Sequence, residues 1–285
     1  MRWIRVLLAC ALMLAAWPST SSAQTKPAAP APAPADDPDK DPNASQPDFT
    51  LIGLPTTLRV PRFSSAFRVT HRFLRPLGAG DFGDLTSDFF GLDSGAQIGL
   101  EYRFGLMRGL QVGIHRTSNK TIEFFTQYSL LQQKDHGFGV DVLASIDGTN
   151  NFKDSYTPAL GVVVSRELGS HGAVYLEPIW VNNTNPLPSE VVDDNDTFVI
   201  GVGARLRIRP TVYVVGEIVP RVNGYDPGST AASFALEKRV GGHAFQLVFS
   251  NTFGLTMAQI ARGGVQNLDG SDNWYMGFNI SRKFF

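Results

Sequence analysis

Two side chains near the end of one extended segment are of the types that nucleophilic catalysis needs. His115 could act as a general base and Ser118 as a nucleophile toward an ester carbonyl. Successive side chains of a strand point to opposite faces, so residues three apart face away from each other. The residue that shares a face with His115 is Thr117. The spacing therefore disfavours a catalytic pair and favours a polar strand end.

The chain has no complete motif for other enzyme chemistry or for a tightly bound cofactor. It contains no Gly-rich phosphate loop, no Gly-x-Ser-x-Gly turn and no His-Glu-x-x-His zinc motif. Cys10 is the single cysteine, which excludes paired cysteine ligands and a disulfide framework. A formal net charge of -1 provides no basic surface for nucleic acid. We predict no enzyme activity, no cofactor and no metal site.

Charged side chains recur on one face of several extended segments, and their signs nearly balance. We expect these to face a common interior: Arg68, Arg72, Glu101, Arg103, Glu123, Asp141, Asp147, Arg205, Arg207 and Glu217. Two interpretations stay open. Ion pairs could bridge and fill the interior, or opposed charges could line a narrow pore that orients a small polar solute.

Clustered carboxylates mark two of the expected loops. These are Asp81, Asp84, Asp88 and Asp93 in the first and Glu190, Asp193, Asp194 and Asp196 in the second. Such groups could bind calcium, or lipopolysaccharide phosphates through bridging divalent ions, because hard cations prefer oxygen ligands. Neither stretch matches a calcium-loop pattern, so solvated loops are the simpler interpretation.

The elements that position these residues are strands in which polar and apolar residues alternate, most clearly over Ala96–Phe104. We predict twelve strands, near Ala66–Phe73, Ala96–Phe104, Leu110–Arg116, Thr121–Gln132, Phe138–Asp147, Ala159–Glu167, Ala173–Val181, Phe198–Ile208, Thr211–Val219, Ser233–Lys238, Ala244–Asn251 and Trp274–Phe284. The connections tend to alternate between short and long, with Thr117–Lys120 as the exception. Bacterial barrels pair short periplasmic turns with longer external loops.

Alternation also occurs in water-soluble β-sandwiches, which are the main structural alternative. The strand number, the loop asymmetry and an N-terminal signal sequence favour an all-β, antiparallel transmembrane β-barrel of about 12 strands. Aromatic residues near strand ends could form the girdles of such a barrel: Tyr102, Phe104, Trp180, Tyr213 and Trp274.

The N-terminal part divides by composition. Residues 1–23 have the basic start, apolar core and small-residue end of a cleaved signal peptide. Residues 24–50 are rich in Pro, Ala and Asp, which predicts a disordered periplasmic arm. Residues 51–285 form the expected barrel.

Near the C-terminus, two features bear on function. The chain ends in Phe284 and Phe285, which we interpret as a signal for the barrel-assembly machinery. If Phe278, Ile280 and Phe284 face lipid, Arg282 does so too, and the sequence does not fix the register of this strand.

The segment Leu255–Arg262 has helical character and could either plug the lumen or cap a loop.

Several segments together resemble an uncharacterised family of predicted bacterial outer-membrane β-barrel proteins. The resemblance runs from about Phe63 to the end and rests on His71–Phe73, Asp88–Ala96, Gly99–Tyr102, Ser118–Thr121 and Gly277–Arg282. Its most distinctive residues are Asp88, Phe89, Phe90, Gly91, Leu92 and Asp93. The resemblance implies fold and outer-membrane location. The family has no assigned substrate, so it implies no catalytic or binding residue.

The leading functional hypothesis is a passive channel or transport-related barrel for small polar solutes. One alternative is a closed structural or adhesive barrel with acidic external loops. A second is a lipid hydrolase, because His115–Asn119 is similar to the His-x-Ser-Asn stretch of outer-membrane phospholipases, although its spacing departs from that pattern. The expected partners are outer-membrane lipids, lipopolysaccharide and the assembly machinery, with no nucleic acid; oligomeric state stays open.

Overall fold

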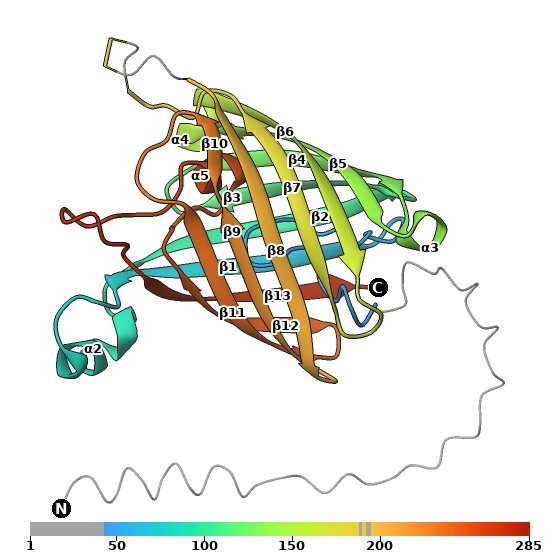
Figure 1. Ribbon diagram of the computed structural model, residues 1–285, viewed down its shortest axis with the longest axis horizontal. Coiled ribbons are helices and arrows are strands. Elements are labelled where there is room, and N and C mark those ends of the chain that lie inside the picture. The colour runs from blue at the N-terminus through green and yellow to red at the C-terminus, as the bar shows by residue number, and fades with distance from the viewer. Residues whose placement is uncertain (1–42, 188–189, 192–194) are drawn as a thin grey trace, which may run out of the picture. The chain divides into compact units, whose positions relative to one another are not determined.

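The computed structural model describes residues 43–187, 190–191 and 195–285, whose strands form a single antiparallel sheet (Figure 1). The strands are β1 (Ser65–Pro76), β2 (Ala96–Met107), β3 (Leu110–Thr117), β4 (Ile122–Leu131), β5 (Gly139–Gly148), β6 (Asp154–Glu167), β7 (Gly172–Val181), β8 (Thr197–Arg209), β9 (Val212–Val219), β10 (Arg221–Gly224), β11 (Ala231–Val240), β12 (His243–Ser250) and β13 (Tyr275–Phe284). The expected signal peptide and residues 24–42 of the expected arm lie outside the described residues.

The sheet closes on itself because its first and last strands pair. Val69 of β1 lies opposite Ile280 of β13, and β8 pairs with β9 on the far side of the barrel. The short strand β10 follows β9 after Pro220 and pairs with the start of β8, so twelve of the thirteen strands make up the barrel. The prediction of a closed antiparallel barrel of about twelve strands is confirmed.

The outer face of the barrel is apolar, as contact with lipid requires. Leu160, Leu176 and Leu236 are 55%, 48% and 51% exposed, whereas Glu177, the neighbour of Leu176, is fully buried. A water-soluble sandwich would bury such leucines between two sheets. The exposed apolar faces therefore exclude the sandwich alternative.

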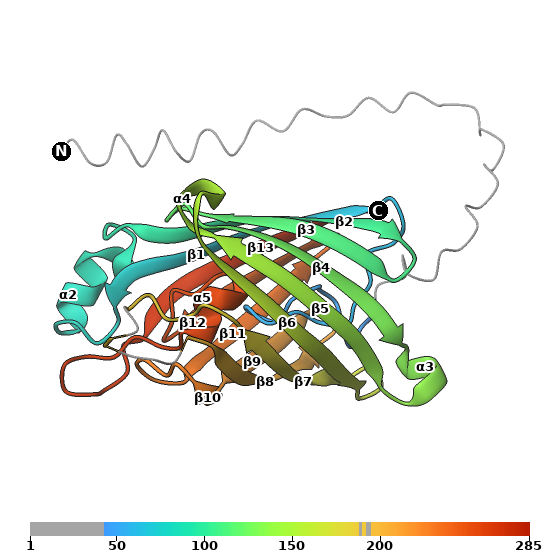
Figure 2. The same ribbon diagram turned by 90° about the horizontal axis from the view of Figure 1, so that it is seen from above.

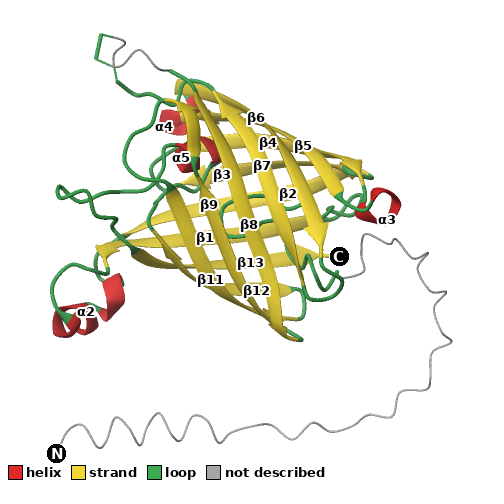
Figure 3. Ribbon diagram, viewed as in Figure 1, coloured by secondary structure: helices red, strands yellow, loops and turns green. Residues whose placement is uncertain are grey.

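The two ends of the barrel differ (Figures 1 and 2). One end carries the short turns, including residues 210–211 and 241–242, together with the C-terminus and helix α3 (Gln133–His136). The other end carries the long connections, residues 77–95, 251–274 and the described parts of 182–196. It also carries helices α2 (Phe82–Ser87), α4 (Thr149–Phe152) and α5 (Met257–Ala261) (Figure 3). We call them the short-turn end and the long-loop end. No helix among the described residues has the length and apolar character to cross a membrane.

Two sequence predictions concern side chains near strand ends. In β13, Asn279 and Ser281 are buried inside, and Arg282 lies outside, 5.3 Å from the centre of the Phe284 ring. The register that places Arg282 on the lipid side is therefore the one observed. Tyr213 is not part of an aromatic girdle, because it faces the lumen and is only 1% exposed.

The expected boundary between arm and barrel at residue 50 is wrong. Ser45 to Thr50 are all buried, and Phe49 is only 3% exposed. The chain passes through the barrel interior before it reaches β1. A Pro/Ala-rich stretch and then an acidic stretch precede this segment, and that composition conceals the buried apolar residues that begin at Phe49.

The lipid-facing assignment can be tested with Leu176→Arg in the middle of β7. We expect this change to lower the free energy of unfolding in lipid vesicles by about 2–4 kcal/mol, because arginine is desolvated near the bilayer midplane. Ile208→Arg, near the short-turn end of β8, should cost only about 0–1 kcal/mol. Equal costs at the two depths would contradict the assignment.

Candidate functional site: two inserted segments in the lumen

An N-terminal hairpin, residues 49–56, lies inside the barrel. Leu51 N donates to Leu54 O at 2.7 Å, and Thr56 N donates to Phe49 O at 2.9 Å, which closes a tight turn at Ile52 and Gly53. Leu51, Ile52 and Leu54 are at most 1% exposed. Burying three such side chains stabilises the inserted position by about 1.5–3 kcal/mol each relative to exposure.

Glycines in β8 provide the space for the hairpin. A Cβ atom at Gly203 would collide with Leu51, and one at Gly201 would lie 3.0 Å from Leu54 Cδ1. Along β8 these inward-facing glycines alternate with outward-facing residues such as Val202. Because glycine has no side chain, they leave room on the inner side of the strand. The wall is therefore shaped to fit the apolar side chains of the hairpin.

The carboxylate of Glu217 on β9 holds the tip of the hairpin. It accepts hydrogen bonds from the backbone N–H groups of Ile52 at 3.0 Å, Gly53 at 2.9 Å and Leu54 at 3.1 Å. Successive N–H groups that converge in a turn form a concave site for an anion. Here the anion is a side chain of the barrel, so the wall and the hairpin are joined at this point.

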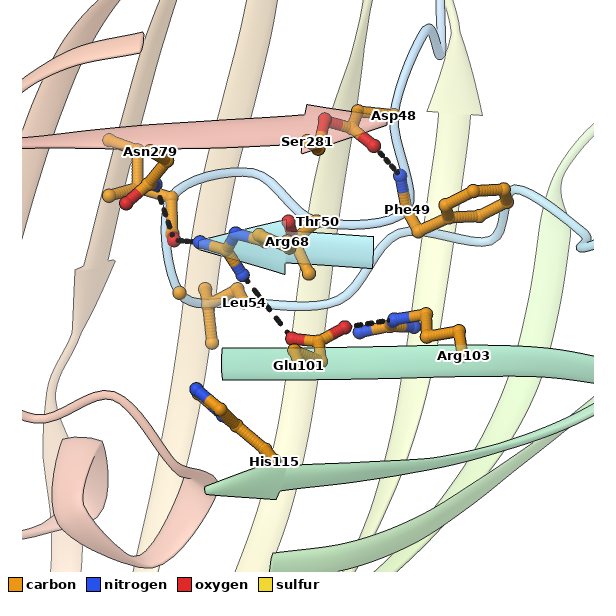
Figure 4. Close-up of polar contacts among 12 residues, drawn as sticks. Asp48, Phe49, Thr50, Leu54, Arg68, Glu101, Arg103, His115, Asn279 and Ser281 are labelled. Atoms are coloured by element: carbon orange, nitrogen blue, oxygen red, sulfur yellow. Dashed lines mark hydrogen bonds and ion pairs between the residues drawn. The ribbon is translucent and has the colours of Figure 1, made fainter. Parts of the chain in front are cut away.

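Wall side chains also donate to the hairpin carbonyls. Arg205 Nη2 lies 2.7 Å from Thr50 O, and Gln246 Nε2 lies 2.7 Å from Leu51 O. Ile52 O accepts from Arg68 and from Asn279 Nδ2, the latter at 3.2 Å (Figure 4). The hairpin is thus bound by side chains from several strands and pairs with none of them as a strand.

Ion pairs behind these donors orient them. Arg68 lies 3.6 Å from Glu101, which also pairs with Arg103 (Figure 4). On the opposite side, Arg205 Nη2 lies 3.0 Å from Glu237. All of these charged groups are buried, and a buried charge without a partner is strongly unfavourable. The pairs therefore hold two hairpin-binding arginines, Arg68 and Arg205, in place.

A second cluster holds the chain where it enters at the short-turn end. The Glu167 carboxylate accepts from Asn43 Nδ2 at 2.7 Å, Ser45 Oγ at 2.9 Å and Gln46 Nε2 at 2.9 Å. Asp48 accepts a hydrogen bond from Ser281 Oγ on β13 (Figure 4). The segment is therefore fixed both at its point of entry and at its tip.

Helix α5 enters the lumen from the opposite, long-loop end. Met257 N donates to Glu123 Oε1 at 3.2 Å, and Thr256 Oγ1 donates to Asp147. Met257 and Ile260 are 6% and 3% exposed. The helical character expected for Leu255–Arg262 is present over Met257–Ala261, and the segment lies in the lumen.

The two inserted segments meet in the middle of the barrel. A Cβ atom at Gly53 would lie 2.7 Å from Ile260 Cδ1 and 3.1 Å from Glu217 Oε1. Only glycine allows the hairpin tip, the helix and the carboxylate to approach this closely. Together the two segments fill the central lumen.

The charged residues expected to face the interior are placed as follows. Nine are buried on the inner face: Arg68, Arg72, Glu101, Arg103, Glu123, Asp141, Asp147, Arg205 and Glu217. Arg207 is half-buried near the short-turn end, where its backbone N–H donates to His171 O at 2.7 Å. Sequence reasoning missed Glu177 and Glu237, which are fully buried. Their alternation with the exposed Leu176 and Leu236 could have identified them.

Two other sequence features lie away from this site. The segment Asp88–Asp93 belongs to the loop after β1, where Asp88 pairs with Arg75 at 2.6 Å and Phe89 is 64% exposed. His115 is buried in the lumen, 3.7 Å from Glu123, whereas Ser118 is exposed and accepts from Ile98 N at 3.0 Å. The structure does not bring His115 and Ser118 together.

The contribution of Glu217 can be measured by amide exchange. Glu217→Ala removes the acceptor of three hairpin N–H groups, and each bond to a charged group is worth about 1.5–3 kcal/mol. We expect exchange at Ile52, Gly53 and Leu54 to become at least about tenfold faster, while the strands stay protected. Glu177→Gln, on the same wall, is the control. Unchanged exchange in Glu217→Ala would argue against this anchor.

A double-mutant cycle tests the contact between the segments. Gly53→Ala should destabilise the inserted hairpin because its new methyl group meets Ile260. In an Ile260→Ala background that cost should fall by about 1 kcal/mol, which is the size expected for residues in direct contact. The free energy of hairpin opening is read from exchange at Leu51. Additive effects would show that Gly53 and Ile260 do not touch.

Comparisons with known proteins support the fold. No curated protein matches the chain. Among solved structures, the NanC porin is 8% identical, with a TM-score of 0.50, and the match covers 78% of this chain and 99% of that one. A mutant porin of Rhodopseudomonas blastica is 9% identical with a TM-score of 0.35, and the match covers 66% of this chain and 55% of that one. LpxR from Salmonella typhimurium is 13% identical with a TM-score of 0.39, over 78% and 100% of the two chains.

A family model provides the assignment. It is described as a membrane bound beta barrel domain, DUF5777, and it matches residues 48–284. This range begins at Asp48, so it includes the N-terminal hairpin as well as the barrel strands. The chain therefore belongs to the DUF5777 family of membrane-bound β-barrel domains, in agreement with the resemblance to an uncharacterised barrel family.

Proposed function

We propose that this protein is an outer-membrane transport barrel for small polar solutes that its own N-terminal hairpin keeps closed at rest. The observation that carries the proposal is how the hairpin is bound. Its backbone is held by wall side chains such as Glu217, Arg205 and Gln246, and by no strand pairing. Water can replace hydrogen bonds of this kind when the hairpin leaves.

The energetics favour movement of the hairpin over movement of the wall. Each barrel strand pairs with two neighbours along its length, and breaking that pairing in hydrocarbon leaves polar groups without partners. The hairpin bonds face a polar lumen, where each is worth about 0.5–1.5 kcal/mol net, or more for those to charged groups. The hairpin therefore opens at a lower cost than the wall strands do.

The geometry also suits a path for polar solutes. Twelve strands fall between eight-stranded barrels, which side chains fill, and sixteen-stranded porins, which hold water. In this barrel the inner face carries charged and amide side chains beside an apolar cluster that packs on the hairpin, which includes Val163, Ile179 and Val199. Replacing buried charges by apolar side chains is often neutral or stabilising, so the charges kept on the inner wall support a role in solute passage.

Planar-bilayer recording of the refolded chain from Gln24 to Phe285 tests this proposal. We expect few or no steady openings in buffer. Sub-denaturing urea should produce openings, because it weakens apolar burial and solvates peptide groups while the paired strands persist. Far-UV circular dichroism recorded in the same urea checks that the barrel remains folded.

A reversible cross-link supplies the matched control. Thr57 Oγ1 and Ser165 Oγ lie 2.5 Å apart, close to the sulfur separation of about 2 Å in a disulfide. In Thr57→Cys/Ser165→Cys, oxidation should abolish the urea-induced openings and reduction should restore them. No other cysteine is present after residue 23. A folded barrel that never conducts, or openings that persist in the oxidised variant, would overturn the proposal.

A further inference from the structure

We infer that the opened lumen favours cations and small cationic solutes over anions, an inference that rests on the proposed function. Its basis is the set of charges buried on the inner wall. The arginines are Arg68, Arg72, Arg103 and Arg205. The carboxylates are Glu101, Glu123, Asp141, Asp147, Glu177, Glu217 and Glu237. Seven carboxylates therefore face four arginines.

Ion pairs engage three of the four arginines but only two of the seven carboxylates. Glu101 is shared by Arg68 and Arg103, and Arg205 pairs with Glu237. In the described part of the chain, no arginine or lysine forms an ion pair with Glu123, Asp141, Asp147, Glu177 or Glu217. Arg72 is the buried wall arginine left over, and it donates to Asn279 Oδ1 at 2.9 Å.

In the closed state, the inserted segments occupy some of these carboxylates. Glu217 binds the hairpin tip, and Glu123 and Asp147 bind the start of α5. When the hairpin leaves, Glu217 loses its N–H partners and faces water. A carboxylate that has lost its donors attracts a mobile cation instead.

Glu177 is an independent indication that the lumen can hold a polar ligand. It is fully buried on β7, and neither of its carboxylate oxygens has a hydrogen-bond partner among the described residues. One oxygen each of Asp141 and Asp147 is also without a partner there. Buried polar atoms are nearly always bonded, so these atoms mark positions that water or a solute occupies when the lumen is hydrated.

The carboxylates without an ion pair and the remaining arginine lie on different strands of the barrel. Glu123, Asp141 and Asp147 lie on the neighbouring strands β4 and β5, with Glu123 opposite Asp147 in the ladder. The remaining arginine, Arg72, lies on β1. Rows of carboxylates along a pore favour cation passage.

Basic residues at the short-turn end do not cancel this effect. Arg207, Arg239 and Lys283 are only half-buried, and Glu167 lies at the same end. Charges near bulk solvent are screened over about 8–10 Å at physiological salt. The narrow, buried centre therefore decides which ions pass.

The test is the reversal potential of the urea-opened channel in a potassium chloride gradient. We expect potassium to be favoured over chloride by at least about threefold. In Asp141→Asn/Glu177→Gln the ratio should fall by about half or more, because two unpaired charges are lost. Neither residue forms a hydrogen bond with an inserted segment, and asparagine at position 141 keeps an oxygen for Gln127 Nε2, which donates to Thr56 O of the hairpin, so opening itself should not change.

The matched control is Asp93→Asn/Asp269→Asn, which removes two exposed loop carboxylates and should leave the ratio unchanged. A channel that conducts with no cation preference, or that prefers chloride, would overturn this inference and leave the proposed function standing. A selectivity that the lumenal variant does not alter would also overturn it. Failure to conduct at all would count against both proposals.

Discussion

Hydrogen-bond satisfaction of the backbone is the constraint on which the rest of this structure depends. A strand in hydrocarbon cannot leave its N–H and C=O groups unpaired, so β1 must pair with β13 and close the sheet. Closure gives each strand one face toward lipid and one toward a shared interior. The leucines outside and the charged groups inside follow from the two-residue period of the strand.

Backbone groups inside the barrel are also hydrogen-bonded, but by side chains of the wall and not by strand pairing. The N-terminal hairpin brings backbone groups into a space where no free strand edge is available, and wall side chains satisfy them. Side-chain bonds are independent of strand register and can be exchanged for water one at a time. The same requirement therefore produces a permanent wall and a removable insert.

The strands and most of the lumenal charges could be predicted from sequence because alternation is local. The hairpin could not, because Leu51, Ile52 and Leu54 follow a Pro/Ala-rich stretch and their partners on β8 and β9 lie about 150 residues or more further along the chain. The roles of Gly201 and Gly203 become visible only when Leu54 and Leu51 are placed against them. Glu177 and Glu237 were within reach of the alternation argument, whereas the ion pair between Arg205 and Glu237 depends on the curvature of the wall.

The inner wall must serve two states with one set of side chains. With the hairpin inserted, Glu217 accepts three N–H groups, and Arg205 and Arg68 donate to carbonyls. Once it leaves, Arg205 and Arg68 keep Glu237 and Glu101 as partners, whereas Glu217 loses its three N–H donors. Loss of the hairpin therefore leaves Arg205 and Arg68 paired and exposes the Glu217 carboxylate to water. This difference, added to the excess of buried carboxylates over buried arginines, links the closed state to the ion preference inferred for the open one.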